Sequence, residues 1–250
     1  MNGLNDRQRK IIESLEADGE IKIVELKQRF DVTEMTIRRD LEKLEQAGLA
    51  RRTFGGAIHV GKDVALKVRT GIQTEAKVAI GRMAASLIQP GESVFIDGGT
   101  TTFEIARSIK PRMEITVVTN ALNVAFELLE KNIPTIVAGG MAMETTATLI
   151  GPFAVSTIGT MAFDRVFLGA TGLTASHGFS NSNIYETEIK KLAIAKAAEV
   201  NIVIDHTKFG AKELFSFAGL QEVQRIITDR LPERELANAC ESAGISVIEA

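Results

Sequence analysis

The fold of the first domain is decided by one stretch of sequence, Val32-Thr33-Glu34-Met35-Thr36-Ile37-Arg38-Arg39-Asp40-Leu41. Thr33 is placed to cap a helix, because its hydroxyl can accept a hydrogen bond from an unpaired backbone N–H of the first turn. Ile37, Leu41 and Leu44 recur at i, i+4 and i+7, which places them on one face of that helix. The stretch therefore predicts an amphipathic helix that begins after Thr33 and stops at Gly48.

Two shorter helices are expected before this one and a hairpin after it. The first helix begins at Asn5 or Asp6, because both residue types cap helices. The second has an apolar side formed by Val24, Leu26 and Phe30. Two strand-like segments, 49–53 and 57–60, flank Phe54-Gly55-Gly56, which is a hairpin signal. Together these elements predict a winged helix-turn-helix, whose later helix lies in the major groove of DNA.

The side of the third helix away from its apolar stripe carries residues that suit DNA. Arginine can make two hydrogen bonds with a guanine, and threonine can meet a phosphate or a thymine methyl group. Arginines just before the hairpin turn suit phosphate contacts from a wing. The candidate DNA-binding residues are Thr33, Met35, Thr36, Arg38, Arg39, Arg51 and Arg52. The alternative is an ordinary solvated helix, in which Arg38 and Glu42 form an i, i+4 ion pair.

Composition limits the class of protein. The chain has 250 residues, is 45% hydrophobic and 24% charged, and has a net charge of −3, as in many globular proteins. Residues 1–62 carry 12 Lys and Arg against 11 Asp and Glu, so DNA binding depends on where the arginines lie. One cysteine, Cys240, allows no internal disulfide, and no apolar run approaches the roughly 18 residues that cross a bilayer. A cytoplasmic protein is expected.

From about residue 75, predicted helices and strands alternate along the chain. Strands are expected at 93–97, 115–119, 135–138, 165–169, 201–205, 225–228 and 246–248, and helices at 76–88, from after the loop 98–102 to about 108, 122–131, 184–199 and from about 232. The alternation predicts an α/β domain with a mostly parallel sheet, and such sheets bind ligands beyond the carboxyl ends of their strands. The expected domains are 1–60 and 75–250, joined by a linker at 61–74.

Two strand ends in this second domain suit an anion. Gly98-Gly99-Thr100-Thr101-Thr102 joins a buried strand to a helix, so close backbone N–H groups, hydroxyls and the positive helix end would all favour phosphate. The alternative is a common Gly-Gly turn with a threonine cap. Lys208 follows another buried strand and would supply a point charge for phosphate, unless it is simply an exposed loop lysine.

Thr36-Ile37-Arg38-Arg39-Asp40-Leu41, with Leu44, Gly48, Arg51-Arg52 and Gly55-Gly56-Ala57, resembles the DeoR-type regulators of bacterial sugar metabolism. The resemblance covers nearly the whole chain. It implies binding to operator DNA as a homodimer or homotetramer, repression of a sugar operon and control by a phosphorylated sugar. It implies no cofactor, and the three scattered histidines give no metal-ligand spacing.

The second half is also similar in pattern to the effector domain of that family, whose fold resembles ribose-5-phosphate isomerase. In this resemblance residues 98–102 match the phosphate loop, and Lys208 matches a lysine that helps to hold phosphate. The effector-binding residues so implied are Asp97, Gly98, Gly99, Thr100, Thr101, Thr102, Asn120, Gly140, Thr171, Glu186, Lys190, Asp205 and Lys208.

The chain departs from the isomerase at Leu168-Gly169-Ala170-Thr171-Gly172, where the isomerase carries Asp-Gly-Ala-Asp. Isomerisation through an enediol needs a placed carboxylate base, so a site that binds without turnover is expected. Many family regulators keep an aspartate where this chain has Thr171, which suggests a different ligand. Two alternatives stay open: an isomerase-like enzyme with an appended domain, and a helix-turn-helix that contacts only protein.

Overall fold

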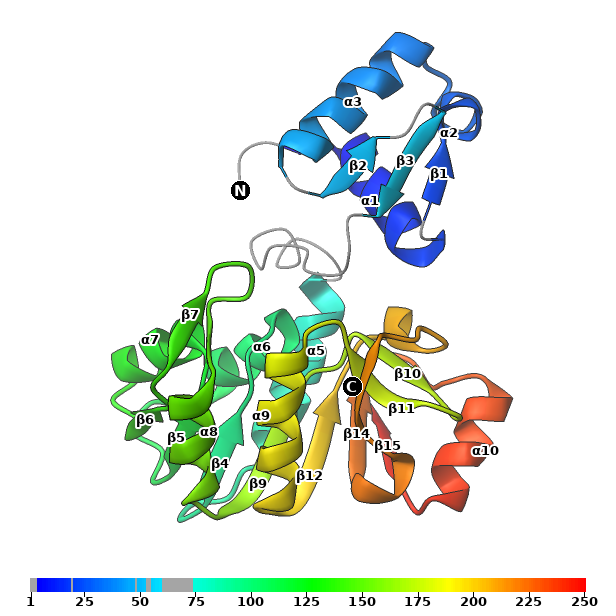
Figure 1. Cartoon of the computed structure of the whole chain (residues 1–250). Coiled ribbons are helices and arrows are strands. Elements are labelled where there is room, and N and C mark those ends of the chain that lie inside the picture. The colour runs from blue at the N-terminus through cyan, green and yellow to red at the C-terminus, as the bar shows by residue number, and fades with distance from the viewer. Residues whose placement is uncertain (1–3, 19, 48, 53–54, 60–73) are drawn as a thin grey trace. The chain divides into compact units, whose positions relative to one another are not determined.

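A computed structural model describes residues 4–18, 20–47, 49–52, 55–59 and 74–250 of the chain (Figure 1). The chain divides into two compact units, Met1–Ile72 and Gln73–Ala250. Most of the expected linker, residues 61–73, and the expected helix stop at Gly48 lie outside the described residues. Within the described part, no helix combines the length and apolar character needed to cross a membrane.

The described part of the first unit contains three helices and a small antiparallel sheet (Figure 1). Its elements are α1 (Asp6–Asp18), β1 (Glu20–Lys22), α2 (Ile23–Phe30), α3 (Glu34–Gln46), β2 (Ala50–Arg52) and β3 (Gly56–His59). The strand order β1-β3-β2 confirms the predicted hairpin, with Arg51 opposite Ile58. Ile37, Leu41 and Leu44 of α3 are fully buried in the core with Ile11 and Leu15 of α1, which confirms the predicted stripe.

The helix boundaries of this unit follow from local capping. Asn5 caps α1 reciprocally, since Gln8 N donates to Asn5 Oδ1 at 2.9 Å and Asn5 N to Gln8 Oε1 at 3.0 Å. Thr33 caps α3 as predicted and accepts from Thr36 N at 3.3 Å. The predicted apolar side of α2 is wrong at Val24, which is 64% exposed. The helix begins at Ile23, one residue before Val24, and Ile23 is the residue that is buried together with Leu26.

The second unit is built on a seven-stranded sheet in the order β15-β14-β12-β9-β4-β5-β6. Its strands are β4 (Ser93–Ile96), β5 (Thr116–Thr119), β6 (Thr135–Val137), β9 (Phe163–Leu168), β12 (Ala197–Val203), β14 (Arg225–Thr228) and β15 (Ser246–Glu249). All six neighbouring pairs are parallel, as the alternation of helices and strands predicts. The order reverses between β4 and β9, where a doubly wound sheet opens a crevice beyond its strand ends.

Helices cover both faces of this sheet (Figure 1). One face packs against α5 (Thr74–Ser86), α6 (Thr100–Ser108) and α7 (Leu122–Glu130), and the other against α8 (Pro152–Gly159), α9 (Ile184–Ala195) and α10 (Arg234–Ser242). Successive strand residues enter opposite cores, so Phe95 packs with the α8–α10 face and Val94 and Ile96 with the α5–α7 face. Burial on both faces explains why these strands are continuous apolar runs.

Two small sheets at the carboxyl edge were not predicted. They are the pair β7 (Met141–Met143) with β8 (Thr148–Ile150), and β10 (Gly172–Thr174), β11 (Gly178–Asn181) and β13 (Phe215–Ala218) in the order β10-β11-β13. The predicted helix 184–199 is wrong in its last residues. It ends at Ala195, because Ala197 already pairs with Phe163 at the start of β12.

Candidate DNA-binding helix and effector site

The exposed face of α3 begins with a pair of threonines. The hydroxyls of Thr33 and Thr36 lie 2.9 Å apart, so the cap also orients Thr36. Met35 beside them is 60% exposed. An apolar side chain at this position would suit contact with a thymine methyl group in the major groove.

The two arginines of α3 differ in their partners. Arg38 donates through Nε to Glu34 Oε1 at 2.8 Å, so its ion-pair partner is Glu34, one turn earlier than the Glu42 considered in the alternative of a solvated helix. Arg39 is exposed and forms no ion pair with any residue that the structure describes. A surface ion pair such as that of Arg38 is weak, so a phosphate or base can replace Glu34.

Asp40 joins α3 to α1 and was missed as a structural residue. It is 4% exposed and accepts from Arg7 Nε at 2.5 Å and from buried Gln8 Nε2 at 2.7 Å. Both acceptor oxygens are therefore used inside the domain. The aspartate of the Arg-Arg-Asp run fixes the angle of α3 and is not available to DNA.

The remaining predicted DNA contacts lie in the hairpin. Arg51 and Arg52 are in β2, paired through their backbones with Ile58 and Ala57 of β3. Their side chains lie outside the described part of the chain.

In the second unit, a buried ion pair lies at the point where the strand order reverses. Asp97 follows β4, Gly169 follows β9, and Lys190 reaches both from the middle of α9. Lys190 Nζ donates to Asp97 Oδ2 and, at 2.8 Å, to Gly169 O. Lys190 and Asp97 are each 2% exposed. A buried charge requires such a partner, and the pair holds α9 against the strand ends.

The glycine–threonine loop lies beside this pair. Gly99 is the N-cap of α6, and Thr100, Thr101 and Thr102 form its first turn, all buried. A Cβ at Gly98 would overlap the methyl group of Thr148, so only glycine fits there. The first N–H groups of a helix have no partner within it, which leaves α6 with its positive end at this edge of the sheet.

A second charged group follows β12. Asp205 is 2% exposed and caps the short helix η1 (His206–Lys208) by accepting from Thr207 N at 3.1 Å. Burial acts to raise the pKa of Asp205, but the ammonium of Lys208, hydrogen bonds from Thr207 and the ammonium of Lys77 together hold it below its ordinary value. Lys77, buried in the first turns of α5 on the same face as Ile80 and Ala84, was not singled out from the sequence, because lysine side chains are rarely buried.

Glu186 lies in a polar group between α9 and the small sheets. Asn183 caps α9, and one turn in, the Glu186 carboxylate accepts from Thr148 Oγ1 at 3.3 Å and from Asn181 Nδ2 at 3.1 Å. Asn120, just beyond β5, donates to Leu149 O at 3.3 Å. The structure thus brings predicted residues Asn120 and Glu186 to β8, together with Asn181, which the sequence did not single out.

Two predicted residues have evident backbone roles. Thr171 donates through both its N–H and its hydroxyl to Ser180 O, at 3.0 and 3.1 Å, and so closes the start of the β10–β11 hairpin. Gly140 has φ of +137° and its missing side chain leaves room for Ile150 O of β8.

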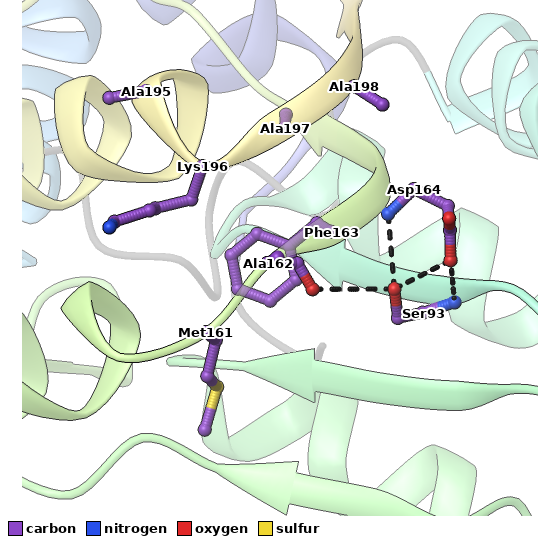
Figure 2. Close-up of a pocket in the computed structure, with 9 residues that line it drawn as sticks. All are labelled: Ser93, Met161, Ala162, Phe163, Asp164, Ala195, Lys196, Ala197 and Ala198. Carbon is purple, nitrogen blue, oxygen red and sulfur yellow. Dashed lines mark hydrogen bonds between the residues drawn. The ribbon is translucent and has the colours of Figure 1, made fainter.

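A hollow of about 530 Å³ lies at the opposite, amino edge of the sheet (Figure 2). Ser93, Phe163 and Ala197 begin the three strands that line it. Ser93 donates to Asp164 through its N–H at 2.8 Å and its hydroxyl at 2.7 Å, which lowers the pKa of Asp164. Since the predicted ligand groups follow the carboxyl ends of the strands, this hollow is a different feature from the candidate effector site.

Both units match described protein families. Residues 7–62 match the DeoR-like helix-turn-helix domain, and residues 72–230 match the DeoR C terminal sensor domain. The HTH-type transcriptional regulator GlpR of Haloferax volcanii is 36% identical over 248 residues, covering 98% of this chain and 97% of that protein. The putative aga operon transcriptional repressor of Escherichia coli O157:H7 is 30% identical and covers 99% of this chain and 94% of its own length.

A solved structure of ribose 5-phosphate isomerase from Methanocaldococcus jannaschii has 14% identity and a TM-score of 0.41 over 55% of each chain, which is too distant to support an argument about function. The two matched families, in contrast, span most of the chain, and the relatives align over nearly their full length. This chain therefore belongs to the DeoR family of DNA-binding transcriptional regulators.

Proposed function

We propose that this chain represses a carbohydrate-utilisation operon and that a phosphorylated sugar, bound in the second unit, controls its affinity for operator DNA. Relatives named as regulators, one of them as an operon repressor, support repression. Membership in a family of transcriptional regulators speaks against the isomerase alternative. The ion pair of Asp97 with Lys190 also occupies one of the carboxylates that would have to act as a base.

For DNA, the proposal places the N-terminal half of α3 in the major groove. Arg39 and Met35 would read base edges, while Thr33, Thr36 and Arg38 would contact backbone or bases nearby. Arg51 and Arg52 would reach phosphates from the wing. The observation that best supports this arrangement is that Arg39 is exposed, without an ion pair among the described residues, on a helix whose other face is buried.

For the effector, the proposal places the phosphate at the start of α6. The loop of residues 98–102 offers N–H groups and hydroxyls, and Lys208 and Lys77 add positive charge near Asp205 at the same edge of the sheet. The other predicted effector residues would surround the sugar. The supporting observation is that the glycine loop and the start of α6 follow β4, where the strand order reverses, and that Lys208 follows β12, the strand next to β9, at the same edge of the sheet.

We propose further that the chain acts in the cytoplasm as a homodimer or homotetramer. Two copies would place two recognition helices on successive half-sites of one operator. Sedimentation of the purified chain gives the oligomeric state, and a monomer at micromolar concentration with and without DNA would contradict this part.

The central test is footprinting of the purified chain on the DNA upstream of its own gene and of the neighbouring genes. We expect one protected, inverted-repeat sequence, and release of that sequence by one member of a panel of pentose and hexose phosphates. A ligand alters DNA affinity only if it binds the free and DNA-bound states unequally. Protection that no phosphate in the panel alters would contradict the effector proposal, and no protection anywhere would contradict operator binding.

A further inference from the structure

Two buried amide oxygens next to Glu186 have no hydrogen-bond partner among the residues that the structure describes. They are Oδ1 of Asn120 and Oδ1 of Asn181. Asn120 is 1% exposed and Asn181 is 5% exposed, so bulk water does not reach them freely. A buried acceptor without a donor destabilises the fold, so such groups are rare in folded domains unless something else supplies the donor.

The orientation of each amide is fixed by its nitrogen. Asn120 Nδ2 donates to the backbone oxygen of Leu149, and Asn181 Nδ2 donates to Glu186 Oε2. Both of those partners are acceptors only, so exchanging the amide oxygen and nitrogen would set oxygen against oxygen. The unpaired atoms are therefore acceptors, and what completes them has to be a donor.

Both asparagines belong to one patch of the carboxyl edge. β8 links them, because Leu149 holds Asn120 while Thr148 donates to the same Glu186 that holds Asn181. Thr148 also packs against Gly98, at the start of the proposed phosphate loop. The patch formed by Asn120, Asn181 and Glu186, here the acceptor patch, is thus linked through Thr148 of β8 to the start of the phosphate loop.

We infer that the acceptor patch binds the hydroxyl groups of the effector's sugar end, and that Asn120 and Asn181 accept hydrogen bonds from them. This inference rests on the proposed function, in which the phosphate lies at residues 98–102. Hydroxyls are donors that fit acceptor oxygens. The phosphate group of a sugar phosphate is mainly a dianion at neutral pH, so it offers mostly acceptors and would be repelled by the Glu186 carboxylate. Phosphate affinity and sugar selectivity are therefore assigned to two neighbouring sets of residues.

The matched control is a third buried asparagine in the same unit. Asn201 is fully buried in β12, donates to Val166 O at 3.3 Å and accepts from Arg225 at 2.9 Å, so its amide is used on both sides. Truncating it removes two hydrogen bonds. Truncating Asn120 or Asn181 removes one hydrogen bond, which destabilises the fold, and also one unpaired buried acceptor, which stabilises it. The two effects on the free energy of unfolding largely offset each other.

The experiment compares wild type with Asn120→Ala, Asn181→Ala and Asn201→Ala by calorimetric titration and thermal unfolding of the full chain. The probes are inorganic phosphate, ribose 5-phosphate, fructose 6-phosphate, glucose 6-phosphate and the corresponding free sugars. We expect Asn120→Ala and Asn181→Ala to lose about tenfold or more in affinity for the best sugar phosphate, a factor that corresponds to one lost hydrogen bond. Affinity for inorganic phosphate should stay within about twofold. Asn201→Ala should lower the unfolding temperature most and leave both affinities unchanged.

The outcomes separate this inference from the proposal beneath it. Suppose that a sugar phosphate binds wild type. If both patch variants bind it with wild-type affinity, or lose affinity for inorganic phosphate by the same factor, the assignment of the acceptor patch is overturned and the phosphate site is still supported. If a free sugar binds as tightly as its phosphate and the patch variants weaken that binding, the acceptor patch is supported and the phosphate site is contradicted. If no probe binds wild type, both fail.

Discussion

At the scale of single residues, the neighbouring residues Arg38 and Arg39 of α3 differ in how freely each could contact DNA. Arg38 is already held by Glu34, while Arg39 is exposed without an ion pair among the described residues. DNA binding by Arg38 therefore has to break a surface pair, which costs little, and binding by Arg39 breaks none.

Replacing Arg39 with alanine is expected to weaken operator binding by about 1–3 kcal/mol and to relax base preference at one position, because a two-bond contact to guanine is lost. Fluorescence anisotropy against the operator and single-base variants of it measures both effects. Lys43→Ala, in the last turn of the same helix, is the charge-matched control and should lower affinity slightly and equally for all sequences. Unchanged operator affinity in Arg39→Ala would remove Arg39 from the base contacts.

Asp205 gives the second residue-scale prediction. Its pKa in the folded chain lies below that of an unfolded aspartate, because Lys208, Thr207 and Lys77 outweigh the effect of burial. A carboxylate of this kind stabilises the fold at pH above the unfolded pKa, near 4, and the contribution is lost as pH falls through the folded pKa.

Asp205→Asn is therefore expected to destabilise the second unit at pH 7 by about 1–3 kcal/mol, the usual range for hydrogen bonds to a charged group. The difference from wild type should shrink as pH falls below about 4, where the wild-type carboxylate also protonates. Urea unfolding at a series of pH values measures it. A difference that stays the same from pH 7 to pH 3 would mean that charge at Asp205 contributes nothing.

At the scale of elements, the position of α3 depends on a buried contact with α1. Asp40 accepts from Arg7 and Gln8, and Gln8 is fully buried and also forms the reciprocal cap with Asn5. The start of α1 and the middle of α3 therefore form one hydrogen-bonded unit. This explains an acidic residue in a helix that is expected to lie against phosphates.

Asp40→Ala is expected to lower the stability of the first unit by about 2–3 kcal/mol, because it leaves a buried amide and a guanidinium without their acceptor. Circular dichroism followed during heating measures the loss, and operator affinity should fall with it. Asp6→Ala is the control, since Asp6 is 91% exposed and pairs only with Arg9 on the surface. Equal unfolding temperatures for the two variants would contradict the structural role of Asp40.

The elements also show where reasoning from the sequence stops. The strands of the large sheet were predicted because they are short apolar runs between helical patterns, and their parallel order followed. The small strands β7, β8, β10 and β13 were not predicted. They have three or four residues each, too few to show a pattern of their own. β7 and β8 pair as a short hairpin, whereas β13 is fixed by its pairing with the distant β11.

At the scale of the whole molecule, the two units have separate cores and separate candidate sites. A change in the effector site should therefore leave DNA affinity intact and alter only its response to the ligand. This is the behaviour expected when a ligand controls a second site through its unequal affinity for two states.

Lys208→Ala is expected to bind the operator as wild type does but to need about tenfold or more effector for release, since the strand-end charge on phosphate is lost. Operator release titrated with the sugar phosphate identified by footprinting measures it. Lys196→Ala is the matched control, because Lys196 lines the hollow at the opposite edge of the sheet (Figure 2). A wild-type response in Lys208→Ala would exclude Lys208 from the effector site.

By itself, the sequence determined the features that depend on neighbours along the chain: the cap at Thr33, the stripe of Ile37, Leu41 and Leu44, the hairpin, and the order of helices and strands. Periodicity and capping are local, so they can be read without coordinates.

Only the tertiary structure decided which distant residues meet. It paired Lys190 with Asp97, a separation of 93 residues, and tied Asp40 to α1. It also brought Lys77 close enough to lower the pKa of Asp205, and left the amide oxygens of Asn120 and Asn181 without a partner among the described residues. Burial and hydrogen bonding between distant segments are properties of packing, and the spacing of residues along a chain does not determine them.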